Sequence, residues 1–262
     1  MSKQFRGIII GLVNQKGGVA KTTSAAALAS IFAARGYKVL ALDTDPQGHL
    51  GVHFGIDTVV NKTLPGTTAD VFTGKKTAEE IALKSDYNDV WVVPASTDEL
   101  SLVEMYLPTK QGSDLQLKSK LKTTRLHFDL IILDAPPNLG KLSINVMAAS
   151  DWLLVPVEGP LGMRSLDAIV QAVATNAEIY DVPTRLLGVF LTMVDRTRIM
   201  NSVREEIEER YHGLLMKSEI RRSTLVRESS ALQTPVPNYA RDSGVSLDYQ
   251  ALTDEMIERM HL

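Results

Sequence analysis

Six short stretches of the chain are apolar at nearly every position, and longer segments with apolar residues every three or four positions lie between them. The continuous stretches are Ile8–Val13, Lys38–Asp43, Val90–Pro94, Phe128–Asp134, Trp152–Val157 and Leu186–Val194. Strands lose the usual alternation of apolar and polar residues when helices cover both faces of their sheet. We therefore expect these stretches to be strands of a buried parallel sheet.

The periodic segments are typical of helices with one buried face. They are Thr22–Arg35, Leu142–Ser150, Ser165–Tyr180 and Asn201–Tyr211. Strands that alternate with helices predict an α/β fold with a doubly wound, mostly parallel sheet flanked by helices. Ligands of such sheets bind beyond the carboxyl ends of the strands. The stretch 51–74 is the least regular, and no internal repeat is present.

Composition narrows the class of protein. With 44% hydrophobic and 23% charged residues, the 262-residue chain can bury a full core, and we expect one domain over residues 1–262. The absence of cysteine excludes disulfides, thiolate metal sites and iron–sulfur clusters, and fits a cytosolic protein. We expect no targeting signal, since the first apolar run is short. We also expect no N-terminal helix-turn-helix domain, because few residues precede that run.

Residues 14–23 form a glycine-bearing loop between the first predicted strand and the first predicted helix. In G-x-x-x-x-G-K-[ST] loops the backbone N–H groups contact nucleotide phosphates, the lysine reaches the outer phosphates and the hydroxyl binds Mg²⁺. The corresponding residues here are Gly17, Gly18, Lys21 and Thr22. A plain glycine turn is the alternative, but the flanking strand and helix favour phosphate binding.

Three aspartates follow predicted strands. Asp43 and Asp45 stand two positions apart and so point to one side of the chain, and Asp134 ends the run of residues 128–134 in the Walker-B pattern. Each could instead cap a turn or a helix. Together with Lys21 they indicate phosphoryl transfer to water, with a carboxylate orienting the water and Asp134 holding Mg²⁺ directly or through water.

These residues resemble the deviant Walker-A ATPases, most closely the short partition ATPases of the ParA/Soj type. The resemblance rests on KGGVAKTT at 16–23, LDTDPQG at 42–48, LDAPP at 133–137 and, more loosely, on residues 220–236. The two lysines of the loop distinguish this group. The resemblance implies binding of ATP and Mg²⁺ and an ATP-dependent homodimer.

The resemblance also assigns roles to individual residues. Lys16 is the signature lysine that reaches the partner's phosphates, and Lys21 acts within its own protomer. Thr22 ligates Mg²⁺, Thr23 touches the α-phosphate, and Asp45 positions the attacking water. Asp43 and Asp134 support the metal. The remaining nucleotide contacts that it implies are Gly17, Gly18, Val19, Ala20, Met193, Arg221 and Ser223.

The chain departs from the family pattern at several positions. Ala20 replaces a glycine and His49 an asparagine, while Arg221 and Ser223 replace the proline and asparagine of the Ile-Pro-Arg-Asn segment beside the adenine. A methyl group at position 20 requires either a negative φ or modest strain.

A net charge of −3 leaves room only for a local basic patch. The candidate cations for DNA phosphates are Arg196, Arg198, Arg204, Lys217, Arg221, Arg222 and Arg227. Glutamates are interspersed with them, so an ordinary solvated helix face is the alternative. We place Arg222 first, because it corresponds to the arginine of the family segment, and Arg227 second. The acidic segment 247–262 disfavours membrane binding, and its apolar side is expected to pack on the domain.

We therefore expect an ATPase that is slow until a ParB-like activator stimulates it. In its ATP-bound dimer it would bind DNA without sequence preference, and it would position a plasmid or chromosome on the nucleoid in the cytoplasm. Three alternatives stay open. They are the positioning of a protein cargo such as a chemotaxis array or microcompartment, a MinD-like regulator of the division site, and an ATP-dependent metabolic synthetase.

Overall fold

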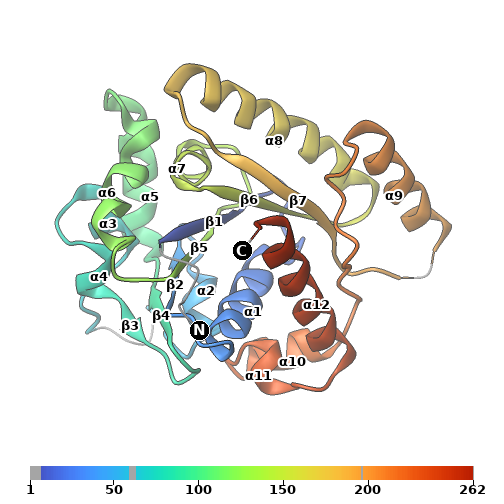
Figure 1. Ribbon diagram of the computed structural model, residues 1–262. Helices are drawn as coiled ribbons and strands as arrows, with labels where there is room; N and C mark the ends of the chain where they lie inside the picture. The colour runs from blue at the N-terminus through green and yellow to red at the C-terminus, as the bar shows by residue number, and fades with distance from the viewer. Residues whose placement is uncertain (1–6, 59–62, 196, 262) are drawn as a thin grey trace.

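The computed structural model describes residues 7–58, 63–195 and 197–261 and is built around a seven-stranded sheet (Figure 1). The strands are β1 (Ile8–Leu12), β2 (Val39–Asp43), β3 (Leu83–Lys84), β4 (Val90–Val93), β5 (Leu130–Asp134), β6 (Trp152–Val157) and β7 (Arg185–Leu191). Their order is β3-β4-β2-β5-β1-β6-β7. Every pair is parallel except β3 with β4. The predicted fold class is confirmed.

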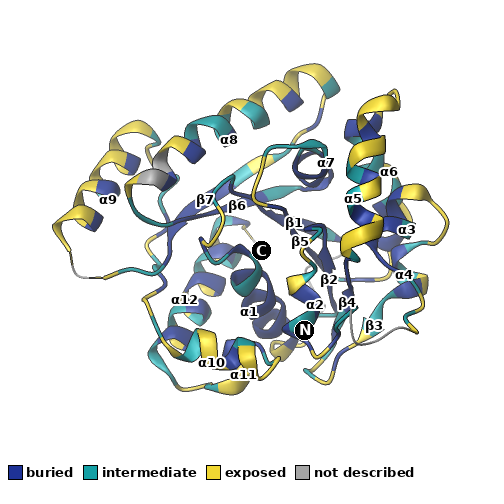
Figure 2. Cartoon of the chain, turned by 180° about the vertical axis from the view of Figure 1, so that it is seen from behind, coloured by how far each residue is buried: buried dark blue, intermediate teal, exposed yellow. Residues whose placement is uncertain are grey.

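Helices cover both faces of the sheet (Figures 1 and 2). On one side lie α1 (Lys21–Ala34), α2 (His49–Val52), α10 (Leu225–Ala231), α11 (Val236–Tyr239) and α12 (Gly244–Arg259). On the other lie α3 (Thr68–Thr73), α4 (Ala78–Ile81), α5 (Thr97–Tyr106), α6 (Gln116–Thr124), α7 (Lys141–Ala149), α8 (Gly159–Tyr180) and α9 (Arg198–Arg210). Short 3₁₀ turns at Leu107–Thr109 and Ser113–Leu115 join α5 to α6.

Successive residues of the central strands enter two different hydrophobic cores. Ile9 and Ile131 belong to the core beneath α7 and α8, whereas Ile10 and Ile132 belong to the core beneath α1 and α12. All four side chains are at most 1% exposed. The continuous apolar runs therefore have the predicted origin, since neither face of the sheet is left to solvent.

The last long helix packs along the first. Leu252 and Met256 of α12, and Met260 directly after it, are buried in the core that α1 shares. The hydroxyl groups of Tyr249 and Ser24 form a 3.0 Å hydrogen bond between the two helices. The expected packing of the apolar side of α12 is confirmed. Within the described ranges, no helix is long and apolar enough to cross a membrane.

The structure also contains elements that the apolar pattern did not indicate. The two-residue edge strand β3 and the helices α5 and α6 lie where no element was expected, and α8 begins at Gly159, six positions before the predicted Ser165. β7 ends at Leu191, because Met193 adopts a positive φ of 51° that a strand cannot continue through.

His53, which follows α2, is 6% exposed, and its Nδ1 has no hydrogen-bond partner among the described residues. Burial, and then the neighbouring His49, lower the pKa of His53 to about 4 from 6.5. The unfolded chain therefore takes up a proton at this residue between those pH values, while the folded chain does not. Acidification through this range favours unfolding.

We expect the free energy of unfolding of the wild-type chain to fall by about 2 kcal/mol more than that of His53→Gln between pH 7 and pH 5. Urea denaturation at several pH values measures this difference. The exposed His127→Gln serves as the control and should follow the wild type. Parallel profiles for wild type and His53→Gln would contradict the assignment.

Candidate nucleotide-binding site

The glycine-bearing loop joins β1 to α1 and is fixed from both sides by buried polar groups. The side chain of Asn14 donates to the carbonyl oxygen of Pro156 at 2.6 Å and accepts from the N–H of Lys16 at 2.8 Å. The Thr192 hydroxyl donates to the carbonyl oxygen of Val19 at 3.2 Å. The ends of β6 and β7 thus position the loop, which leaves the N–H groups at the start of α1 available for an anion.

Lys21 places a positive charge inside this site. Its side chain begins α1, is 6% exposed and donates from Nζ to the carbonyl oxygen of Lys16 at 3.1 Å. Burial lowers the pKa of Lys21, and the nearby Asp134 and Asp45 carboxylates oppose that change. A buried ammonium beside two carboxylates is suited to holding the outer phosphates of a nucleotide.

Asp134 stands at the carboxyl end of β5, directly between Leu12 of β1 and Asp43 of β2 in the strand register. It is fully buried, and neither carboxylate oxygen has a hydrogen-bond partner among the described residues. Burial raises the pKa of Asp134 to about 7. The nearby Thr22 hydroxyl and the charge of Lys21 oppose this rise. The Thr22 hydroxyl does not have the geometry of a hydrogen bond to the carboxylate.

The residues present fit a magnesium ion. Asp134 offers two orphaned oxygens, and the Thr22 hydroxyl is near enough to lower the pKa of Asp134. No group of three or more His, Asp or Glu residues with metal-binding geometry occurs in the described part of the chain. Mg²⁺ usually binds one or two protein oxygens and completes its octahedron with phosphate oxygens and water, so this small donor set is sufficient.

Asp43 and Asp45 have different surroundings. Both oxygens of the buried Asp43 accept backbone hydrogen bonds, from Asp45 N–H at 3.0 Å and Leu50 N–H at 2.9 Å. Burial, followed by the charge of Asp134, raises the pKa of Asp43 well above its usual value. Asp43 therefore shapes the loop that carries Asp45. Asp45 Oδ1 accepts from Gln47 N–H at 3.0 Å, and Asp45 faces the cavity of the glycine loop.

Two adjoining cavities meet at Ala20. The first, of about 310 Å³, is lined by Gly17, Gly18, Ala20, Lys21, Thr22, Thr23, Asp45, Gln47, His49 and Pro137. The second, of about 240 Å³, is lined by Ala20, Met193, Ile220, Arg221, Arg222, Ser223, Val226, Arg227 and Tyr249. Of the residues expected beside the phosphates, Lys16 and the buried Val19 do not line the first cavity, whereas Met193, Arg221 and Ser223 all line the second.

Ala20 itself is strained. It is the residue before α1 and adopts a left-handed conformation, with φ 62° and ψ 29°. A side chain at such a φ costs about 1 kcal/mol or more relative to glycine. Of the two expected possibilities, a negative φ or modest strain, the structure shows the strained one. The backbone at position 20 is in a region that glycine adopts readily.

Two other residues of the second cavity, where the adenine was expected, are held by neighbouring groups. Arg221 forms a bidentate ion pair with Asp248 of α12, with both N···O distances at 2.7 Å. The Ser223 hydroxyl accepts from Leu225 N–H at 3.3 Å, close to the start of α10. Arg221 therefore buttresses the cavity wall in place of the family's proline.

The first lysine of the loop is paired within its own chain. Lys16 Nζ lies 2.6 Å from Glu158 Oε2 and also donates to the carbonyl oxygen of Glu158 at 3.3 Å. Glu158 follows β6 and was not among the residues singled out from the sequence. Nor were Asn14 and Thr192, because their contacts join segments more than 140 residues apart.

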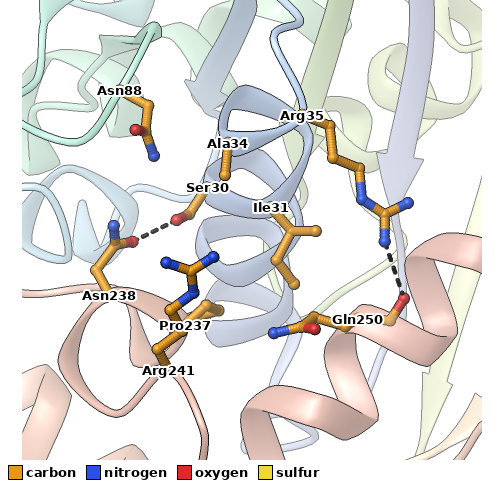
Figure 3. A pocket seen from close by; sticks show the side chains of 9 residues that line it. All are labelled: Ser30, Ile31, Ala34, Arg35, Asn88, Pro237, Asn238, Arg241 and Gln250. Atoms are coloured by element: carbon orange, nitrogen blue, oxygen red, sulfur yellow. Dashed lines mark hydrogen bonds between the residues drawn. The ribbon is translucent and has the colours of Figure 1, made fainter.

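Another cavity, of about 530 Å³, opens at the other end of α1 (Figure 3). Arg35, Arg241 and Gln250 are among the side chains around it, and the Ser30 hydroxyl donates to Asn238. It is larger than the cavities at the loop but contains none of the predicted site residues. We therefore assign the expected nucleotide binding to the cavities at the loop and not to this larger cavity.

Comparison with known proteins agrees with this site. A family described as an AAA domain matches residues 7–185, which includes the loop, all three aspartates and the strands that carry them. The chain belongs to this family. Together with curated relatives named as chromosome-partitioning ATPases, the match makes it a P-loop ATPase of the ParA/MinD type.

Three relatives of this ATPase are informative. It is 29% identical to the chromosome partitioning protein ParA of Caulobacter vibrioides over 96% of this chain and 94% of that protein. A cobyrinic acid a,c-diamide synthase from Mycobacterium smegmatis, solved with an ATP analogue and magnesium, has a TM-score of 0.83 and 26% identity over 97% and 96%. An McdA–ATP complex from Cyanothece has a TM-score of 0.86 and 21% identity over 97% and 96%, and shows the shared fold.

The strain at position 20 predicts that Ala20→Gly stabilises the chain. We expect the free energy of unfolding to rise by about 0.5–1 kcal/mol, because glycine adopts a positive φ without steric cost. Urea denaturation measures the change. Ala34→Gly, at an exposed helical position of α1, is the matched control and should lower stability by up to about 1 kcal/mol. A loss of stability in both variants would contradict the strain.

Proposed function

We propose that this protein is an ATP-operated switch that positions DNA. One observation carries the ATPase part: the buried Lys21 ammonium lies beside Asp45 and Asp134 at the ends of adjacent parallel strands, where the glycine loop opens. Lys21 would bind the phosphates, Thr22 and Asp134 would hold Mg²⁺, and Asp45 would orient the attacking water. The bound ATP analogue and magnesium of the Mycobacterium smegmatis relative support this pair of cofactors.

The proposed ATP state is a homodimer. Lys16 is not needed inside the buried cluster around Lys21, and its side chain is 29% exposed at the rim of the loop. From there its ammonium would contact phosphates presented by a second copy of the chain. We propose Lys16 in that role, as the resemblance to partition ATPases implies.

DNA binding would depend on cations that no carboxylate neutralises. Arg204 is bound by Glu219 through two hydrogen bonds, and Arg221 by Asp248, so neither has a free charge for DNA. Arg227 has no ion-pair partner in the described ranges, and Arg222 only the 3.6 Å contact with Glu158. Arg196 lies outside the described residues.

Arg198 and Lys217 also have no ion-pair partner in the described ranges, so we place Arg222 and Arg227 first for their position beside the proposed nucleotide. Both are exposed, and both line the cavity proposed for the adenine. Nucleotide binding would therefore act on the same segment as DNA binding. A dimer would present each arginine twice, which converts weak contacts into useful affinity without sequence preference.

The cargo in this proposal is a plasmid or chromosome, in keeping with relatives named for chromosome partitioning. A ParB-like activator would stimulate slow hydrolysis and release the protein from the nucleoid in the cytoplasm. Slow basal turnover is expected where the charge-stabilising groups are incomplete until a partner contributes.

The ATPase site is tested by single substitutions. We expect Lys21→Ala to lower ATP turnover about 100-fold or more, because it removes the charge that faces the outer phosphates. Asp45→Ala should lose turnover but still bind ATP. Steady-state phosphate release and equilibrium ATP titration measure these effects, with the exposed Lys75→Ala as control. Wild-type rates in both variants would rule the site out.

DNA binding is tested with duplex of arbitrary sequence, with and without ATP, between about 50 and about 200 mM salt. We expect affinity only with ATP, a steep fall with salt, and a loss of about two charge contacts per dimer for Arg222→Ala or Arg227→Ala. The exposed Arg185→Ala, at the start of β7 and thus at the other end of that strand from the Val194–Arg221 bridge, is the control. Binding that ignores nucleotide or salt would count against the switch.

A metabolic synthetase is the second candidate, because one solved relative at 26% identity has that name. The two functions differ in what accelerates hydrolysis. Stimulation by a small carboxylic acid without DNA or a protein partner would favour the synthetase. Stimulation by a DNA-bound protein partner would favour positioning.

A further inference from the structure

Glu158 contacts two cations with different proposed roles, Lys16 in the dimer and Arg222 in DNA binding. Its Oε2 lies 2.6 Å from Nζ of Lys16, and its Oε1 lies 3.6 Å from Nη2 of Arg222. The Glu158 backbone carbonyl accepts a second hydrogen bond from Lys16 at 3.3 Å. One carboxylate thus bridges the glycine loop and the segment proposed to bind DNA.

We infer that Glu158 is a positioning residue that holds Lys16 inside its own protomer until a second copy presents phosphates. This inference rests on the proposed function, in which Lys16 crosses to the partner. The Lys16 ammonium has three N–H groups, and Glu158 engages it from both its side chain and its backbone. Lys16 therefore has to leave Glu158 before it can serve a phosphate on a facing chain.

Arg222 makes that departure feasible. A carboxylate that loses its only cation inside a closing interface is costly, because it is desolvated without a partner. Here Arg222, 60% exposed, already stands 3.6 Å from the other oxygen of Glu158. Glu158 therefore keeps a cation beside it when Lys16 leaves, while Arg222 stays exposed.

The pair's exposure limits its strength. The Lys16 and Glu158 side chains are 29% and 27% exposed, so water screens their attraction. Holding Lys16 back should therefore weaken dimerisation by about two- to fivefold and not by orders of magnitude. That amount sets a concentration threshold without preventing assembly.

The test uses Glu158→Gln in the full-length chain, with Glu219→Gln as matched control. The Glu219 side chain is 24% exposed and forms another ion pair, with Arg204. The first measurement is the rate at which an amine-directed reagent labels Lys16 in the nucleotide-free chain, followed by mass spectrometry. We expect labelling to rise about two- to fivefold in Glu158→Gln and to stay at the wild-type rate in the control.

The second measurement is the dimer dissociation constant from sedimentation with a non-hydrolysable ATP analogue and Mg²⁺. We expect it to fall about two- to fivefold in Glu158→Gln. In a Lys16→Gln background the same substitution should have no effect, a result that a merely structural role for Glu158 would not produce. Glu158→Asp, which keeps the charge, should restore most of the wild-type value.

The outcomes separate the inference from the proposed function. A wild-type chain that stays monomeric with the analogue overturns the proposed dimer, and the labelling rate still reports on the Glu158 contact. A wild-type chain that dimerises, combined with equal or weaker dimerisation of Glu158→Gln, overturns the inference. Unchanged Lys16 labelling in Glu158→Gln overturns it as well.

Discussion

A positive charge buried at the start of a helix is the constraint on which the rest of this site depends. Removing the Lys21 ammonium from water is unfavourable, and burial accordingly lowers its pKa. The Asp45 and Asp134 carboxylates offset that cost, and the Asp134 carboxylate is itself buried without a hydrogen-bond partner among the described residues. Each buried charge therefore depends on the others to offset the cost of its removal from water. An arrangement of this kind gains most from a ligand that is both anionic and accompanied by a cation, which is the chemical description of Mg²⁺-nucleotide.

The central architecture could be predicted from the sequence, because strands buried on both faces of a sheet have unbroken apolar runs. Six strands begin within two residues of the predicted positions, namely β1, β2, β4, β5, β6 and β7. The site residues at the carboxyl ends of these strands could therefore be predicted as well. The edge strand β3 has only two residues, and α5 exposes Leu102, Met105 and Tyr106, so neither carries a clear apolar period. Weak patterns of this sort cannot be separated from loops.

Within the site, the residues that bind through their own chemistry were predictable and those that act through position were not. Lys21 and Asp134 are recognisable from their local neighbours in the chain. Asn14 and Glu158 make ordinary hydrogen bonds whose importance arises only from distant partners, such as the 142-residue separation between Asn14 and Pro156. For Ala20, local steric rules gave two possible outcomes, and the surrounding fold selected the strained one.

The order of strands in the sheet also determines when this site can come into being. β1, which is made early in translation, pairs only with β5 and β6, and both are made more than a hundred residues later. The loop after β1 therefore emerges from the ribosome without the groups at the ends of β6 and β7 that hold it. Nucleotide binding would thus report that the central sheet of a newly synthesised chain has closed, and early-stage chains would not compete for cellular nucleotide.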